Sequence, residues 1–365
     1  MSIKTGLLKL VDNFFGRFLT SCLPPPNSLI PGSLSSILLI RPGGIGDALL
    51  LSMTVAALHK YFRDATIDVL AEKRNARAFA LMPGIREVFT YDDPSDLCTI
   101  LRRRYDIAVD TEQWHRLSAV VCRLVRSSIK VGFDTNERRR MFTHPIPYLP
   151  DQFESESFFN LLGPLGIADD FLTNNDLLIV PEAAQQKVAS ILSDIKQLPL
   201  LALFPAASIQ EKRWDPRKFR EFVWWCNENE LQVVILGGKH DRALGEYVAA
   251  RNALNLAGLT SLEESAAVME KAAIVVSGDS GMLHLAFCLD RPTVSIFGPS
   301  NDIKWAPRGS KHIIVKRGLS CSPCSRFGNT PKCLKGVQCL QEISVEEVIA
   351  ATEALLARNM QGNRF

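Results

Sequence analysis

The segment from residue 274 to residue 297 places the strongest constraint on the fold of this chain. It begins with the β-branched apolar run 274–276, which stops at Ser277-Gly278 before a helix-like stretch. A second apolar run, 293–297, comes directly after Pro292. This order predicts a strand, a turn, a helix and a second strand, which is the repeating unit of a parallel α/β sheet. Ligands of such sheets bind at the carboxyl ends of the strands.

Polar residues gather at the turn after the first of these strands. Asp279, Ser280 and His284 lie there with Gly281 and Met282 at a predicted helix start. A helix start can bind phosphate, because its first N–H groups have no partner within the helix. Taken alone, the turn also allows a purely structural interpretation, with Asp279 as a helix cap and His284 as a packed residue.

A second loop, near the amino end, has a similar form. The apolar run 37–40 is followed by Arg-Pro-Gly-Gly-Ile-Gly-Asp and by a predicted helix over 48–61. Gly43, Gly44 and Gly46 let the backbone turn tightly and approach a ligand. Their spacing matches neither a dinucleotide fingerprint nor a P-loop. Asp47 stands at the helix start, where it either caps the helix or points into the site that the turn faces.

Short apolar runs alternate with helical patterns along the chain, and its 365 residues predict two domains. We expect an α/β protein of two Rossmann-like domains facing a central cleft. The expected parts are an amphipathic segment and linker at 1–34, a first domain at 35–180, a second domain at 181–345 and a C-terminal helix and tail at 346–365. Further strands are expected at 66–71, 88–91, 107–110, 129–133, 200–204, 233–236 and 255–257.

The charge pattern argues against one class of partner. A net charge of +3 is too small to indicate nucleic acid. Positive charge is concentrated locally in Arg102-Arg103-Arg104 and Arg138-Arg139-Arg140. These clusters are either solvated surface or a source of attraction for an anionic acceptor or membrane.

The amino-terminal segment is apolar along one face of a predicted helix. No run reaches the ~20 apolar residues of a membrane span. Leu19-Thr20-Ser21-Cys22 is similar to a lipoprotein cleavage site, but Asp12 and Arg17 interrupt the apolar run, so we reject export. The helix then either lies on a membrane surface or packs on the protein. We expect a cytoplasmic protein, with peripheral contact at the inner membrane as the alternative to a freely diffusing one.

Taken together, the two loops resemble the signature loops of the heptosyltransferases, glycosyltransferase family 9. Phe204-Pro-Ala-Ala-Ser208-x-x-x-Lys212-Arg-Trp214 and Phe297-Gly298-Pro299-Ser300 are similar to two further segments of that family. The resemblance runs from about residue 35 to about residue 350 in the family's order. It implies a GT-B type fold, ADP-heptose as the donor, inversion at the anomeric carbon and no organic cofactor.

Such a reaction needs a general base for the acceptor hydroxyl and stabilisation of the leaving diphosphate. The loop position and the resemblance favour Asp47 as the base. No Asp-x-Asp pair has a setting for a catalytic metal, so we expect metal-independent transfer. Lys239 stands where an acidic residue of the family can contact ribose, which weakens the assignment of ADP. The expected donor-binding residues are Ser208, Lys212, Lys239, Asp279, Ser280, Gly281, Met282 and His284.

The expected acceptor is the lipopolysaccharide core or a related anionic glycolipid. Three alternatives remain open. The first is a heptosyltransferase acting on a protein hydroxyl, and the second is a nucleotide-sugar epimerase-like enzyme on the same fold. The third, less favoured because Asp47, Lys212 and Asp279 are all present, is a non-catalytic binding protein.

Four of the nine cysteines fall within nineteen residues, in a stretch with few apolar residues. Cys321, Cys324, Cys333 and Cys339 have a spacing compatible with a tetrathiolate zinc or iron site. Two disulfides or free thiols are the alternatives. Some heptosyltransferases that modify proteins carry a four-cysteine iron site in this region, so the resemblance supports a structural zinc or iron.

Overall fold

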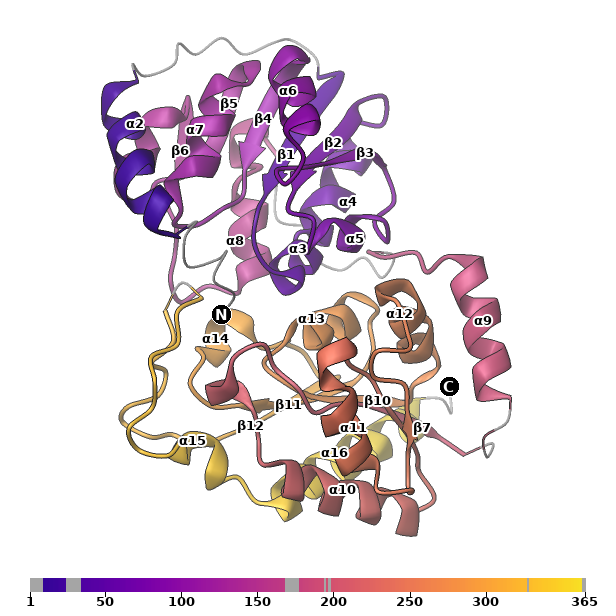
Figure 1. Cartoon of the computed structure of the whole chain (residues 1–365). Coiled ribbons are helices and arrows are strands. Elements are labelled where there is room, and N and C mark those ends of the chain that lie inside the picture. Colours follow the sequence, from indigo (N-terminus) through magenta and orange to yellow (C-terminus); the bar gives the residue numbers. More distant parts are fainter. Residues whose placement is uncertain are drawn as a thin grey trace. The chain divides into compact units, whose positions relative to one another are not determined.

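The chain divides into two compact units, Met1–Ile179 and Val180–Phe365 (Figure 1). The computed structural model describes residues 9–23, 34–167, 177–193, 195, 198–326 and 328–362, without the side chains of 359–362. Each unit contains one six-stranded sheet, in which every pair of neighbouring strands is parallel. The linker expected within 1–34 lies mostly outside the described residues.

The first unit has the strand order β3-β2-β1-β4-β5-β6. Strand β1 is buried along nearly its whole length, because helices pack over the sheet on both sides of this central position. The strands are β1 (Ser36–Arg41), β2 (Thr66–Ala71), β3 (Ile85–Thr90), β4 (Arg104–Asp110), β5 (Arg126–Phe133) and β6 (His144–Ile146). The helices are η1 (a π-helix, Asp12–Gly16), α2 (Arg17–Cys22), α3 (Ile45–Leu50), α4 (Ser52–Tyr61), α5 (Ala76–Phe79), α6 (Pro94–Arg102), α7 (Arg116–Leu124), η2 (Asn136–Met141), α8 (Glu154–Asn160) and η3 (Gly163–Leu165).

The second unit repeats the topology, with the order β12-β11-β10-β7-β8-β9. Its strands are β7 (Leu200–Phe204), β8 (Gln232–Ile235), β9 (Leu254–Asn255), β10 (Ile274–Gly278), β11 (Thr293–Phe297) and β12 (His312–Lys316). Its helices are α9 (Glu182–Leu192), η5 (Gln210–Lys212), α10 (Pro216–Glu228), η6 (Lys239–Asp241), α11 (Arg242–Ala249), α12 (Leu262–Lys271), α13 (Gly281–Cys288), α14 (Asp302–Trp305), α15 (Gln338–Gln341) and α16 (Val345–Gly362).

The strands expected from apolar runs are present, and two features differ from the expectation. The helix predicted over 48–61 is interrupted at Leu51, so it forms α3 and α4. Strands β6 and β12 were not expected, because β6 has only three residues and the apolar run of β12, 313–315, is short and mostly half-buried. Both lie at a sheet edge, where one side of the strand has no neighbour to pair with.

Helix α16 completes the core of the second unit. Val345, Val348 and Leu355 join the cluster that contains Trp214 and Phe222. The helix begins with a capping box, in which the Ser344 N–H donates to Glu347 Oε2 at 2.8 Å and the Glu347 N–H donates to Ser344 Oγ at 3.3 Å. The C-terminal helix is therefore an integral part of this unit.

A buried ion pair joins the last residue of β4 to η2 in the first unit. Arg138 Nη2 lies 2.6 Å from Asp110 Oδ2, and both side chains are fully buried. Burial raises the pKa of Asp110, although the Arg138 charge opposes that rise. Arg138 also donates to the carbonyl oxygen of Glu112. One member of the Arg138-Arg139-Arg140 cluster is thus a buried structural residue, whereas Arg139 and Arg140 are exposed.

We predict that Arg138→Met lowers the free energy of unfolding by ~3–5 kcal/mol, because Asp110 is left buried without its partner. Urea unfolding followed by circular dichroism measures the change. Arg140→Met, an exposed residue of the same short helix, is the matched control and should change stability by less than ~0.5 kcal/mol. Equal effects of the two substitutions would contradict the structural role of the pair.

Candidate active site

Both sheets reverse their strand order between the first and fourth strands of the unit, which are β1 and β4 in one sheet and β7 and β10 in the other. Open α/β sheets bind ligands at the carboxyl ends of the strands beside such a reversal. The two loops singled out by the sequence follow β1 and β10, so each lies at the reversal of its own sheet.

In the second unit, three loops converge on one carboxylate. The Nζ of Lys212, a residue that follows β7, lies 2.6 Å from Asp279 Oδ2. Ser300, which follows β11, donates from its Oγ to the same oxygen at 2.5 Å. Asp279 comes directly after β10. The contact between Lys212 and Asp279 therefore joins the two strands at which the order reverses.

The electrostatics of this cluster keep Asp279 ionised. Burial by itself raises the pKa of Asp279, but the Lys212 charge and the hydrogen bonds from Lys212 and Ser300 outweigh burial and lower it. The Lys212 ammonium has three donors, and one of them is directed at Asp279. Because the remaining donors can serve another anion, Lys212 can contact a phosphate without leaving Asp279.

The turn after β10 is capped by Ser280 rather than by Asp279. The Ser280 side chain accepts from the Leu283 N–H at 3.4 Å, and its Oγ lies 2.9 Å from that of Ser277. The cap interpretation of Asp279 is therefore wrong, and its carboxylate is available to Lys212. Gly281 begins α13, and Met282 follows it, so their N–H groups belong to the first turn.

The other expected donor-binding residues have different surroundings. His284 is 4% exposed, and its ring centroid lies 6.2 Å from that of Trp305, so it packs within the second unit. Ser208 is exposed beyond β7, and Lys239 is exposed on η6 beyond β8. All three lie on segments that follow strands of the same sheet, but only Lys212 contacts Asp279 through a described ion pair.

In the first unit, Arg41 holds the glycine-rich loop. Its guanidinium donates to the carbonyl oxygens of Pro42 at 2.7 Å and Thr111 at 2.6 Å, and it lies 3.1 Å from Glu112 Oε2. Burial by itself lowers the pKa of Arg41. The negative charges of nearby carboxylates, above all Asp47 and Glu112, outweigh burial and raise that pKa. The pair Arg41–Glu112 joins the loops after β1 and β4 across the reversal of this sheet.

Glycine is required in this loop for two reasons. Gly43 has a φ of +112°, which L side chains rarely adopt, and its N–H donates to Glu72 Oε1 at 3.1 Å. A Cβ on Gly43 would also lie 3.0 Å from Arg41 Nη2. A Cβ on Gly44 would lie 3.2 Å from Asp47 Oδ2. The loop is therefore closely fitted around the Arg41 and Asp47 side chains.

Asp47 lies in the first turn of α3, after Gly46, and is half-buried. The N-cap of α3 is Gly44, and no side chain accepts a cap hydrogen bond there. Asp47 is thus not the cap of this helix, and its carboxylate lies over the glycine turn. A carboxylate in this position can accept a proton from a hydroxyl bound at the turn.

Sequence reasoning gave no site role to three residues of these clusters: Ser300, Arg41 and Glu112. Arg41 directly follows the apolar run 37–40, whereas Glu112 and Ser300 each stand three residues beyond the end of an apolar run. What sequence cannot show is the strand order, which decides that the ends of β1 and β4 are neighbours.

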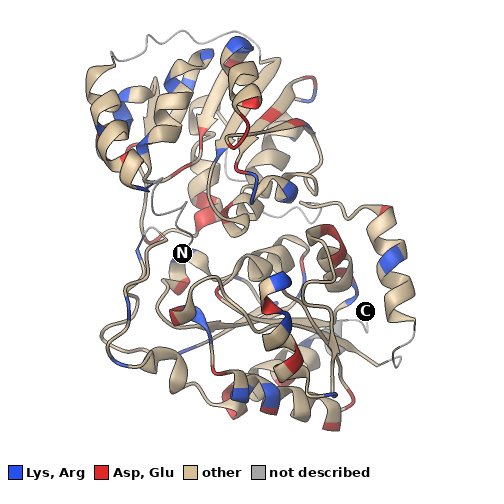
Figure 2. Cartoon of the chain, in the orientation of Figure 1, with Lys and Arg blue, Asp and Glu red and all other residues tan. Residues whose placement is uncertain are grey.

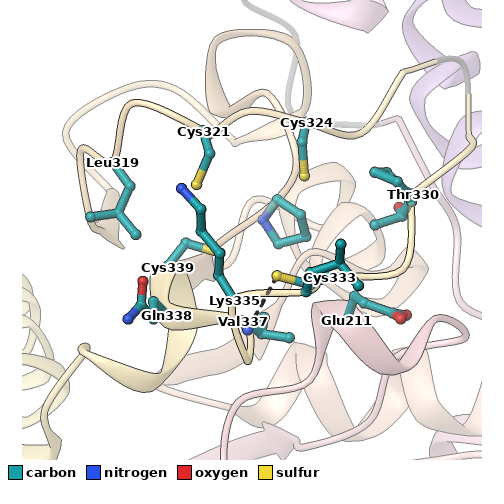
Figure 3. A pocket seen from close by; sticks show the side chains of 13 residues that line it. Glu211, Leu319, Cys321, Cys324, Thr330, Cys333, Lys335, Val337, Gln338 and Cys339 are labelled. Carbon is teal, nitrogen blue, oxygen red and sulfur yellow. Dashed lines mark hydrogen bonds between the residues drawn. The ribbon is translucent and has the colours of Figure 1, made fainter.

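The four cysteines of the second unit line one cavity of about 210 Å³ (Figure 3). None of the four forms a disulfide, so the disulfide alternative is wrong. Burial and then the neighbouring cysteines raise the pKa of Cys324 and bring that of Cys339 to about 11. Within the described residues, no three His, Cys, Asp or Glu side chains are placed to hold a metal ion. The thiols share a pocket but do not form a coordination sphere in this arrangement.

The cysteine segment is bonded to the loop that supplies Ser300. The N–H groups of Cys324 and Ser325 donate to the carbonyl oxygen of Pro299 at 2.9 and 2.8 Å. Ser322 Oγ donates to the carbonyl oxygen of Gly298 at 2.5 Å. The cysteine segment is therefore linked by hydrogen bonds to the backbone just before Ser300, which contacts Asp279.

Comparison with known sequences decides the family. The profile of glycosyltransferase family 9 (heptosyltransferase) matches residues 97–335, more than half of the chain. The chain belongs to this family. It is therefore a glycosyltransferase, as the two loops predicted. It is similar to lipopolysaccharide heptosyltransferase 3 of Escherichia coli, with 26% identity over 343 residues that cover 87% of this chain and 98% of the relative.

Solved structures agree on the fold. The ADP-heptose lipopolysaccharide heptosyltransferase II of E. coli has a TM-score of 0.73 at 22% identity, covering 89% of this chain and 99% of that one. A family 9 glycosyltransferase of Veillonella parvula has a TM-score of 0.77 at 20% identity, covering 91% and 100%. The predicted fold class, two Rossmann-like units of the GT-B type, is confirmed.

One further similar structure is that of an iron-containing enzyme. The iron-containing dodecameric glycosyltransferase TibC of enterotoxigenic E. coli has a TM-score of 0.59 at 13% identity, covering 93% of this chain and 78% of that one. Its likeness to this chain is one of fold.

Among the helices of the described residues, none combines the length and apolar character needed to cross a membrane.

Proposed function

We propose that this glycosyltransferase transfers a heptose from ADP-heptose to the lipopolysaccharide core or a related glycolipid, with inversion at the anomeric carbon. The observation that carries the proposal is the pair of matched clusters at the two strand-order reversals. One offers a cation and hydrogen-bond donors around Asp279, and the other offers the Asp47 carboxylate over a glycine turn.

The second unit binds the donor in this proposal. Lys212 and the N–H groups of Gly281 and Met282 supply positive charge and dipoles for the diphosphate, which becomes more negative as it leaves. Ser280 and Ser208 add hydroxyl groups. Asp279, held ionised by Lys212, accepts hydrogen bonds from hydroxyls of the donor sugar. This set stabilises the leaving group through the protein's own residues, so we propose that no catalytic metal is required.

The first unit supplies the base. Asp47 removes the proton of the acceptor hydroxyl as the oxygen forms its bond to the anomeric carbon, and the bond to the diphosphate breaks on the opposite side. Arg41 acts as a positioning residue, because it holds the loop that carries Asp47 through Pro42 and Thr111.

The names of two relatives support the proposed donor and acceptor. The E. coli heptosyltransferase II is named for ADP-heptose, and the relative with 26% identity is named for lipopolysaccharide. We propose that this chain uses the same classes of substrate, at the cytoplasmic face of the inner membrane. The direct experiment incubates the protein with ADP-heptose and a panel of glycolipid and protein acceptors. Release of ADP only when a glycolipid is present supports the proposal, whereas acceptor-independent turnover would indicate an epimerase-like reaction.

Asp47→Asn tests the general base. We expect turnover to fall by ~10²–10⁴-fold, the usual contribution of a positioned base, while ADP affinity stays nearly constant. The measurements are steady-state kinetics and calorimetry. Asp64→Asn, an exposed carboxylate of the same unit, is the control. Near-normal turnover of the Asp47 variant would remove this residue from the role.

Lys212→Ala tests the donor site. The loss of a charged hydrogen bond to the diphosphate should weaken ADP binding by ~1.5–3 kcal/mol, and the unpaired Asp279 carboxylate should repel the ligand as well. Calorimetric titration with ADP measures the effect. Lys316→Ala removes a lysine that pairs with Asp302 at 2.6 Å on the surface, so it controls for the loss of an ion pair. Unchanged ADP affinity in the Lys212 variant would place the phosphates elsewhere.

We also propose that Cys321, Cys324, Cys333 and Cys339 bind one structural zinc or iron ion. They line one cavity, and the segment that carries them has few buried side chains, so metal–thiolate bonds would supply folding free energy that packing does not. Four thiolates would leave no open position for chemistry. The iron named for TibC supports the same assignment.

Elemental analysis of protein purified without an affinity tag tests this site, with about one equivalent of metal expected. Cys321→Ser with Cys324→Ser should abolish the metal and lower the thermal midpoint, whereas Cys98→Ser, an exposed cysteine of the first unit, should do neither. Less than a tenth of an equivalent of any transition metal in the wild-type protein would show that the thiols are free.

A further inference from the structure

The helical segment at the amino end of the first unit has the reverse of the usual polarity of a surface helix. Helices η1 and α2 run together from Asp12 to Cys22. The residues that face the protein are polar or small, namely Asp12, Gly16 and Thr20. The large apolar side chains of this segment that are exposed are Leu10, Phe14, Phe15 and Phe18, at 59%, 75%, 64% and 64%. A helix adapted only to packing on a soluble protein would bury its apolar face.

Polar contacts fix this orientation. Asp12 Oδ1 accepts from the N–H groups of Arg116 and Leu117, both at 2.7 Å, so it caps the start of α7. Arg17 Nε lies 3.3 Å from Glu137 Oε1. A Cβ on Gly16 would lie 3.0 Å from Arg116 Cβ, so the backbone packs closely at this point. The apolar side chains cannot turn inward without breaking these contacts.

The surroundings of the apolar face are basic. Helices η1, α2, α7 and η2 pack together and carry two acidic and six basic residues. Two of the basic residues, Arg116 and Arg138, are buried and paired with carboxylates, and the other four are at least partly exposed. Figure 2 shows Lys and Arg spread over these helices. Both acidic residues are engaged: Asp12 is buried against α7, and Glu137 pairs with Arg116 and Arg17. Arg17 and Arg139 are 68% and 60% exposed, and Arg140 is exposed as well.

We propose that Leu10, Phe14, Phe15 and Phe18 form a docking face for an anionic lipid bilayer, with Arg17, Arg139 and Arg140 at the headgroups. Apolar side chains on one helix face with cations beside them are the features that hold a helix in the plane of a membrane interface. Cationic side chains gain further from the negative surface potential of anionic lipids. The two interpretations of this segment from sequence are therefore compatible, since the helix packs on the protein through one face and meets lipid through the other.

A second copy of the chain is a less favourable occupant. In a two-fold dimer through this face, the same patch meets itself, so the exposed arginines of one copy would lie in the same interface as those of the other. Like charges brought together in this way oppose association. An anionic bilayer satisfies both the apolar and the cationic parts of the surface.

The test is co-sedimentation of the full-length protein with vesicles of phosphatidylglycerol and phosphatidylcholine, or of phosphatidylcholine alone. The wild-type protein should bind the mixed vesicles and bind them less at high salt. Phe14→Ser with Phe18→Ser should weaken this binding by roughly ten- to a hundredfold, because two exposed anchors are lost. Trp224→Ser with Tyr247→Ser replaces two exposed aromatics of the second unit and should leave it unchanged. Circular dichroism verifies that each variant is folded.

Three results would overturn the proposal. The first is that the wild-type protein does not bind the mixed vesicles. The second is that the Phe14/Phe18 variant binds them as well as the wild type does. The third is that the wild-type protein forms a dimer without lipid and that this variant does not. Arg139→Gln with Arg140→Gln should reduce the preference for phosphatidylglycerol without removing all binding. No transfer reaction is measured, so the inference goes beyond the proposed function and can fail while that function stands.

Discussion

The reversal of strand order in each sheet is the constraint on which both clusters depend. It places the loops after β1 and β4 side by side in one unit, and those after β7 and β10 side by side in the other. A polar group that ends a buried strand must then be satisfied at the carboxyl edge of the sheet. Each reversal carries an ion pair that joins its two loops, Arg41–Glu112 in the first unit and Lys212–Asp279 in the second.

These ion pairs serve different purposes, although their positions correspond. Arg41 is only 2% exposed, and its donors are taken by backbone carbonyls and a carboxylate, so it acts as a brace. Breaking such a buried pair leaves an uncompensated charge, which is costly. Lys212 is more accessible and has donors to spare, so it can contact a ligand while it stays paired with Asp279. Arg41 thus holds the loop that carries Asp47, and Lys212 offers a positive charge that a ligand can reach.

Two segments outside the sheets, the cysteine segment and the amino-terminal helices, are attached to the rest of their units by polar contacts. The cysteine segment is hydrogen-bonded to the backbone just before Ser300, the residue that donates to Asp279. The amino-terminal helices are bonded to the start of α7 through Asp12 and leave phenylalanines exposed. In both, polar contacts attach a segment that contributes little apolar burial. We propose that the remaining side chains serve a metal in one segment and lipid in the other.

The sequence by itself determined the parallel α/β class, most strands and the position of the polar loops after β1 and β10, at residues 43–47 and 279–281. These features depend on local periodicity and on residues that lie close together in the chain. Only the tertiary structure decided that Ser300 donates to Asp279, that Arg41 reaches Glu112 and Thr111, and that Arg138 is buried. It also decided which face of the amino-terminal helix is exposed, because periodicity identifies an apolar face but not whether that face meets the protein. Such contacts join residues far apart in the chain, and they follow from the order of the strands, which no local pattern specifies.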